Sequence, residues 1–83
     1  GLRSGTIEAT TTAQPLSTGT LPIMQVIIQN APSQQTSIFV GDRRYQYYEL
    51  TSGSSVTLPV CDLSLVYVRS EAGTVTVNWI ACE

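Results

Sequence analysis

Apolar and polar residues alternate in short runs along most of the chain, and turn-forming residues separate the runs. We predict six short strands, because β-branched and aromatic residues recur in runs between clusters of Gly, Pro, Asn and Ser. The predicted strands cover residues 23–29, 37–40, 45–50, 56–60, 65–69 and 74–81. No window repeats apolar residues at helical spacing, so no helix is expected. The pattern predicts an all-β fold, a small antiparallel β-sandwich or a jelly-roll-like barrel.

The last two predicted strands flank Glu71-Ala72-Gly73, a compact turn with glycine where a positive φ is needed. We therefore predict that residues 65–69 and 74–81 pair as a hairpin. Alternation divides the final strand into an inner face and an outer face. The inner face is Val75, Val77 and Trp79, and the outer face is Thr76, Asn78 and Ile80.

Residues 1–20 differ in composition from the rest, because their only large apolar side chains are Leu2, Ile7 and Leu16. A segment so poor in apolar residues buries too little surface to offset the entropy cost of ordering it. Since β-branched residues are frequent in it, we predict an extended N-terminal arm that adds a strand to a sheet edge. The sandwich domain is predicted over residues 21–83. The alternative for residues 1–20 is an unstructured tail.

The overall composition restricts the class of partner. The chain has 83 residues, a net charge of -2 and 12% charged residues, with no Lys and no His. A neutral, hydroxyl-rich surface suits close contact with protein or sugar. Nucleic-acid binding is not expected, because it needs clustered Lys and Arg. No apolar run is long enough to span a membrane, so no membrane partner is expected either.

No catalytic arrangement is apparent, and we expect no enzymatic activity. The absence of His removes most general-base and nucleophile arrangements. The acidic residues mostly fall in predicted turns or at chain ends, where carboxylates are usually solvated or cap their own backbone. No glycine run leads into a helix, so no phosphate loop is present. We therefore predict no catalytic residue and no cofactor.

The cysteines Cys61 and Cys82 form a candidate pair. Extending the predicted hairpin register places Cys82 within one or two positions of Cys61. A disulfide there would close a loop of about 20 residues, which is worth about 3 kcal/mol in the chain-entropy model. The alternative is two reduced, buried thiols, as is usual in a cytosolic compartment. Two cysteines without histidine do not form a zinc site, so no metal is expected.

Two arginines, Arg43 and Arg44, stand next to three of the four tyrosines. Tyr and Arg are enriched among residues that dominate binding energy at interfaces. We predict that Arg43, Arg44 and Tyr48 contact a partner. Tyr45 and Tyr47 share the other face of the strand and are expected in the core.

Four segments carry a resemblance to a known group of proteins. They read IFVGD at 38–42, LTSGSSVTL at 50–58, DLSLVYV at 62–68 and GTVTVNW at 73–79. Together they resemble the small β-sandwich virion proteins of tailed bacteriophages, over about two thirds of the chain. The cysteine pair is not part of this pattern.

The resemblance implies a capsid decoration (cement) protein, made in the host cytoplasm and bound to the outer surface of the virion. Its partner would be the major capsid protein of the same particle, and homotrimers at local three-fold positions are favoured. The arm would clasp neighbouring capsid subunits, which makes Leu2, Arg3 and Ile7 contact candidates. Two alternatives stay open. One is a carbohydrate- or receptor-binding module that uses Tyr48, Tyr67 and Asn78, and the other is a small tail or neck connector.

Overall fold

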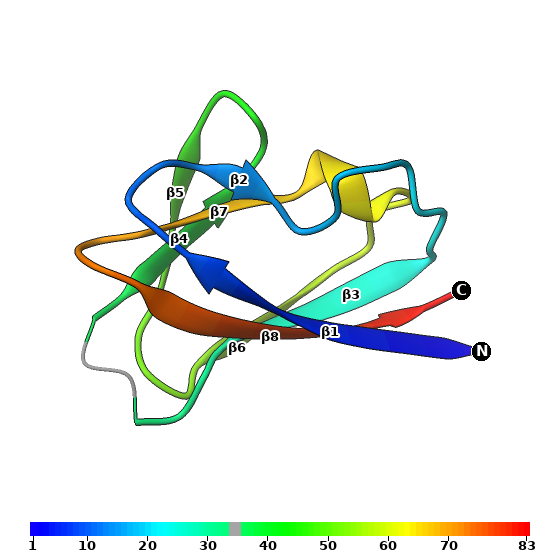
Figure 1. Cartoon of the computed structure of the whole chain (residues 1–83). Coiled ribbons are helices and arrows are strands. Elements are labelled where there is room, and N and C mark those ends of the chain that lie inside the picture. Colours follow the sequence, from blue (N-terminus) through cyan, green and yellow to red (C-terminus); the bar gives the residue numbers. More distant parts are fainter. Residues whose placement is uncertain (34–35) are drawn as a thin grey trace.

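Two four-stranded antiparallel sheets face each other in the computed structural model, which describes residues 1–33 and 36–83 (Figure 1). One sheet has the order β1-β8-β3-β6, and the other has the order β2-β7-β4-β5. The strands are β1 (Leu2–Ala9), β2 (Gln14–Pro15), β3 (Gln25–Asn30), β4 (Ile38–Gly41), β5 (Gln46–Leu50), β6 (Ser55–Leu58), β7 (Tyr67–Ser70) and β8 (Val75–Cys82). A 3-10 helix, Leu63–Leu65, precedes β7. The all-β sandwich is confirmed, and the sheets do not close into a barrel.

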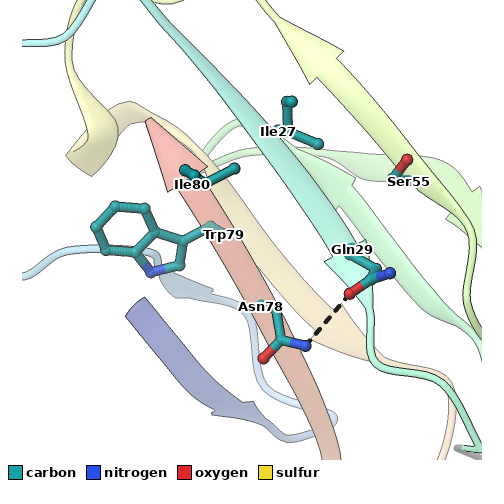
Figure 2. A pocket seen from close by; sticks show the side chains of 6 residues that line it. All are labelled: Ile27, Gln29, Ser55, Asn78, Trp79 and Ile80. Carbon is teal, nitrogen blue, oxygen red and sulfur yellow. Dashed lines mark hydrogen bonds between the residues drawn. The ribbon is translucent and has the colours of Figure 1, made fainter. Parts of the chain in front are cut away.

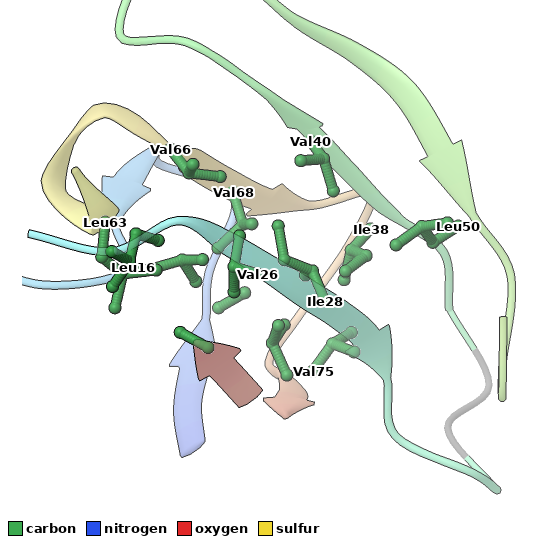
Figure 3. Close-up of a cluster of buried hydrophobic side chains, with 14 residues drawn as sticks. Leu16, Val26, Ile28, Ile38, Val40, Leu50, Leu63, Val66, Val68 and Val75 are labelled. Carbon is green, nitrogen blue, oxygen red and sulfur yellow. The ribbon is translucent and has the colours of Figure 1, made fainter. Parts of the chain in front are cut away.

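The core lies between the two sheets and is built from the apolar positions that alternate along the strands (Figure 3). On β3, Val26 and Ile28 point inward and are fully buried, whereas Ile27 points to solvent. On β8, Val75 and Val77 are buried, and Trp79 packs against the same cluster while remaining partly exposed. The predicted inner face of the final strand is therefore confirmed.

The predicted hairpin between the last two strands is wrong. β7 pairs with β2 and β4 in one sheet, whereas β8 lies between β1 and β3 in the other. The turn at Gly73 has the predicted positive φ of 63°. This turn carries the chain from β7 in one sheet across to β8 in the other sheet, and not back along the same sheet. Crossing lets β7 and β8 bury their apolar faces against each other from opposite layers, which a hairpin in one sheet does not permit.

The N-terminal segment is also placed differently from the prediction. β1 pairs with β8 over eight residues, from Leu2 opposite Cys82 to Ala9 opposite Val75, and β2 pairs with β7. Residues 2–9 and 14–15 are therefore strands of the two sheets. The predicted addition of an extended segment to a sheet edge occurs within the chain itself, since β1 is an edge strand, but the segment is not separate from the sandwich of residues 21–83. The reason is that backbone pairing with β8 satisfies the N–H and C=O groups of β1, so that few apolar side chains suffice to hold it.

A buried amide joins the two layers at one end of the sandwich. Asn30, at the end of β3, is fully buried, and its Nδ2 donates to the backbone oxygens of Leu50 at 2.9 Å and Thr36 at 3.0 Å. Leu50 ends β5 in the opposite sheet. The bond to Leu50 links β3 to β5 of the opposite sheet at this end of the sandwich, and the bond to Thr36 links β3 to the loop before β4.

Candidate functional site

An apolar groove opens between the edge strands β5 and β6, which belong to different sheets and do not pair with each other. Its volume is about 520 Å³, within the range of roughly 300–1,000 Å³ typical of ligand sites. We call it the β5–β6 groove, and its lining is Val40, Gly41, Asp42, Tyr48, Val56, Leu58, Val60, Leu65 and Val66. Almost all of these side chains are apolar, so the groove is a surface that favours burial against a partner.

Each wall of the β5–β6 groove comes from a different element. The inner face of β6 supplies Val56 and Leu58, and the opposite sheet supplies Tyr48. Leu65, at the end of the 3-10 helix, stands at the rim. Tyr48 is 60% exposed and Leu65 is 55% exposed, although both are large side chains with apolar surface. These two residues therefore offer the largest area for burial by a partner.

Asp62 fixes the segment that carries Leu65. Its Oδ1 accepts hydrogen bonds from the backbone N–H groups of Leu21 at 3.1 Å and Ser64 at 2.9 Å, and from the Ser64 hydroxyl at 2.9 Å. These donors stabilise the ionised carboxylate and lower the pKa of Asp62 from its usual 3.8, the Leu21 amide having the largest effect. The rim of the groove is thus held in place before a partner binds.

The loop of residues 42–45 is held just as firmly. Asp42 Oδ1 accepts from the backbone N–H groups of Tyr45 and Arg44, both at 2.8 Å, and the Asp42 N–H donates to the Tyr45 carbonyl at 2.9 Å. The Tyr45 and Arg44 amides, in that order, are the main causes of a lowered pKa for Asp42. A side chain at Gly41 would overlap the Tyr45 carbonyl oxygen, so the closure of this loop requires glycine. The loop therefore presents Arg43, Arg44 and Tyr45 on a preformed backbone.

A second hollow, of about 660 Å³, adjoins the groove, and its mostly apolar lining includes more polar surface than that of the groove. Its lining is Asp42, Arg43, Arg44, Ser64, Leu65 and Tyr67, and Asp42 and Leu65 also line the groove. Across the described residues, the ion pair that forms is Arg3 with Glu83, at 3.6 Å. Arg43 and Arg44 take part in none there, and Asp42 is the carboxylate nearest to them in the loop. We call this region the arginine hollow.

The structure corrects the prediction for two tyrosines. Tyr45 and Tyr47 are 53% and 74% exposed, and their rings stack with centroids 5.5 Å apart. A bulge explains this, because Val40 pairs with Tyr48 while Gly41 pairs with Gln46, which leaves Tyr47 as an extra residue. Gln46 turns inward. Leu50 was the available signal, because alternation places Leu50 on the same face as Tyr48 and opposite to Tyr47.

The predicted contact residues fall into two separate groups. Arg43, Arg44 and Tyr48 lie together around the arginine hollow and the β5–β6 groove. Leu2, Arg3 and Ile7 are on β1, at the opposite edge of the first sheet from β6. Leu2 is exposed, Arg3 pairs with Glu83, and Ile7 is half-buried against the core. The sequence interpretation missed Leu65 and the groove face of β6.

The residues considered for sugar binding are not brought together. Asn78 lies on the outer face of the first sheet beside a shallow depression, where its Nδ2 donates to Gln29 Oε1 at 3.3 Å (Figure 2). Its Oδ1 accepts from the Thr6 hydroxyl at 3.1 Å. Tyr48 lines the groove, and Tyr67 lines the arginine hollow. No single sugar ring can contact all three.

Both cysteines are free, and the predicted disulfide is not formed. Cys61 and Cys82 lie on opposite sides of the chain that leads into β3, where Ile23 N–H donates to Cys61 O and Met24 N–H donates to Cys82 O. Neighbouring strands are about 4.8 Å apart, so two strand spacings exceed the Cα separation of about 7 Å that a disulfide tolerates. The expectation failed because it rested on the hairpin of β7 with β8.

The part of the chain that the structure describes offers neither a metal site nor a membrane-spanning helix. Within residues 1–33 and 36–83, no three His, Cys, Asp or Glu side chains lie close enough together to hold a metal ion. The same described part of the chain contains no helix of the length and apolar character needed to cross a membrane.

No family model, curated protein or solved structure matches this chain.

Proposed function

We propose that this chain is a structural virion protein that binds the outside of a phage capsid and stabilises the shell. The observation that carries the proposal is the β5–β6 groove, an exposed apolar surface beside a rigid loop with two arginines that make no ion pair among the described residues. The sequence resemblance to small phage virion proteins gives the partner class. No comparison with known proteins supports it further.

The energetics favour a protein surface as partner. A standard interface buries about 800 Å² on each side, which is about a sixth of the 4721 Å² that this domain exposes. Tyr48 and Leu65 would lose most of their exposure in such an interface, and Arg43 and Arg44 would add charge-assisted hydrogen bonds at its rim. Their backbone is already fixed, so binding costs little ordering of the loop.

Stabilisation would follow from mass action. A protein that binds the closed shell but not loose subunits shifts the equilibrium toward the shell. Many identical sites on one particle let a modest affinity per site add up. Three copies at each local three-fold position are the arrangement that the resemblance favours.

Co-sedimentation tests the proposal. Purified protein is titrated against intact particles from its own source, and saturable pelleting at a fixed ratio to the major capsid protein is expected. Pelleting at only a few copies per particle would instead indicate a tail, neck or fibre component. If the protein stays in the supernatant while particles remain intact, the proposal is wrong.

A double variant and a matched control test whether the particle binds at the β5–β6 groove. Tyr48→Ser combined with Leu65→Ser should weaken pelleting by about tenfold or more, because truncating central interface residues costs over 1 kcal/mol each. Met24→Ser is the matched control, since Met24 is 72% exposed and lies outside the groove. Equal loss in both variants would show that the groove is not the contact surface.

A further inference from the structure

The four sheet edges differ in how well they are protected from pairing with another strand. β1 carries Arg3 and Glu8, and β2 has two residues, one of them Pro15. β5 is interrupted by the bulge at Tyr47. Charges, proline, short length and bulges are the devices that natural proteins use to block edge pairing. Three of the four edges are therefore blocked by at least one of these devices.

The outer edge of β6 carries no charge, no bulge and no proline. Its four residues, Ser55–Leu58, pair with β3 in unbroken register. Pro59 follows the strand, and the chain stays alongside the segment before β3, because Ile23 N–H donates to Cys61 O at 3.0 Å and Pro22 bridges to Asp62. Every second residue of such an edge directs its N–H and C=O outward. This edge is therefore open to one more strand.

A strand added to β6 would also fill the groove. It would extend the first sheet by one strand, and its inward-facing side chains would point into the space beside Val56 and Leu58, opposite Tyr48. The lining of this space is almost entirely apolar. One extended segment would thus satisfy both the free backbone groups of β6 and the exposed apolar walls.

We infer that the β5–β6 groove receives an extended segment of the shell protein, which adds to β6 as a further strand and places a carboxylate against Arg43 and Arg44. This inference rests on the proposed function and specifies how the surface is used. It belongs to the general mode of recognition in which main-chain hydrogen bonds give affinity and alternate side chains give specificity.

Charge complementarity selects the occupant. The arginine hollow adjoins the groove at Leu65 and Asp42, so a segment that leaves the groove in that direction passes the two guanidinium groups. Asp42 Oδ1 accepts hydrogen bonds from the backbone N–H groups of Tyr45 and Arg44. The negative charge of Asp42 offsets one of the two arginine charges, so the loop has a net charge of +1. The fitting segment therefore alternates apolar residues along one face and ends in Asp, Glu or a terminal carboxylate.

A second copy of this chain fits less well. Paired antiparallel at β6, it would bring the turn of residues 51–54 toward the arginines, and Thr51-Ser52-Gly53-Ser54 has no carboxylate. The two-fold arrangement would leave both arginine hollows without a counter-charge from that turn. We therefore assign the groove to the shell protein and treat self-association as an outcome that the experiment must detect.

Hydrogen–deuterium exchange of the full chain, free and bound to intact particles, tests the inference directly. Binding should slow exchange in residues 55–58 by roughly tenfold or more, because outward N–H groups of β6 gain hydrogen bonds. In parallel, Arg43→Gln with Arg44→Gln should weaken co-sedimentation by about tenfold, with a reduced dependence on salt. Glu71→Gln is the control for a change of charge elsewhere, since Glu71 is exposed and follows the end of β7 that is opposite to Tyr67 and the arginine hollow.

The outcomes separate this inference from the proposed function. If the protein pellets but only residues 42–48 gain protection, the proposed function stands and strand addition is wrong. If residues 55–58 are already protected in free protein that sediments as a dimer, the occupant is a second copy and the inference is wrong. If the protein does not pellet at all, the proposed function fails and the inference fails with it.

Discussion

The indole of Trp79 lies over Gly5, its register partner on the neighbouring strand, in the space that a side chain at position 5 would occupy. A Cβ built on Gly5 would be 2.7 Å from Cζ2 of the indole and within 3.0 Å of two further ring atoms. Trp79 is the single tryptophan of the chain and packs against the core. Because Gly5 has no side chain, the indole of Trp79 can lie directly over β1.

Gly5→Ala should displace this ring. We expect a loss of stability of about 1–2 kcal/mol from overpacking, together with a red shift of tryptophan fluorescence as the indole moves toward water. Gly19→Ala is the control, because a Cβ there meets no atom within 4 Å. Unchanged emission in Gly5→Ala would mean that β1 and not Trp79 moves to make room.

Gly41→Ala should lower the stability of the fold more than an alanine substitution at the turn residue Gly53. The new methyl group would overlap backbone, the Tyr45 carbonyl oxygen, so the loop of residues 42–45 would have to open. We expect a cost of about 3 kcal/mol in urea unfolding, whereas Gly53→Ala should cost about 1–2 kcal/mol, the strain of its positive φ of 78°. Equal midpoints for the two variants would contradict this account of the loop.

Acid should destabilise the protein through Asp62 and Asp42. Both carboxyl groups have a pKa lowered below the usual 3.8, chiefly by the amides of Leu21 and Tyr45 respectively. A group with a depressed folded pKa stabilises the fold above its unfolded pKa, and this contribution is lost as pH falls through the folded pKa. Stability should therefore decline as the pH falls below about 4, the range set by the unfolded carboxyl pKa.

Asp62→Asn with Asp42→Asn tests that assignment. The amide oxygens can still accept the backbone hydrogen bonds, but the charge and its titration are removed. Urea unfolding at pH 7 and at pH 3 should show a smaller difference for the double variant than for the parent protein. If the two proteins lose the same stability on acidification, other groups determine the acid response.

Both cysteines should stay reduced within a single chain, even under mild oxidation. The segment that leads into β3 separates Cys61 from Cys82, so intramolecular pairing would require displacement of that segment. Alkylation followed by intact-mass measurement should show both thiols modified after air exposure. Cys61→Ser and Cys82→Ser should each leave the unfolding midpoint almost unchanged, because neither removes a cross-link. A single chain that resists alkylation at both positions would contradict this.

The approximate positions of β3 to β8 and of their turns were readable from the sequence, whereas β1 and β2 were not predicted as strands of the sandwich. Alternation in residues 74–81 marked Val75, Val77 and Trp79 as inward, and Gly73 marked a turn with positive φ, because both depend on local backbone geometry. The Arg43 and Arg44 cluster was recognisable from residue type. These features require knowledge of only a few neighbouring residues.

The tertiary structure decided which strands pair, and hence where the site lies. A short turn at Gly73 fits both a hairpin and a crossing between sheets, and only packing of β7 and β8 against opposite layers of the core selects the crossing. That choice separates Cys61 from Cys82 and leaves β8 free to pair with β1. The exposure of Tyr45 and Tyr47 depends in the same way on a bulge against β4. Alternation along a strand specifies two faces, but the neighbouring strands and the opposite sheet determine which face is buried and which edge stays open.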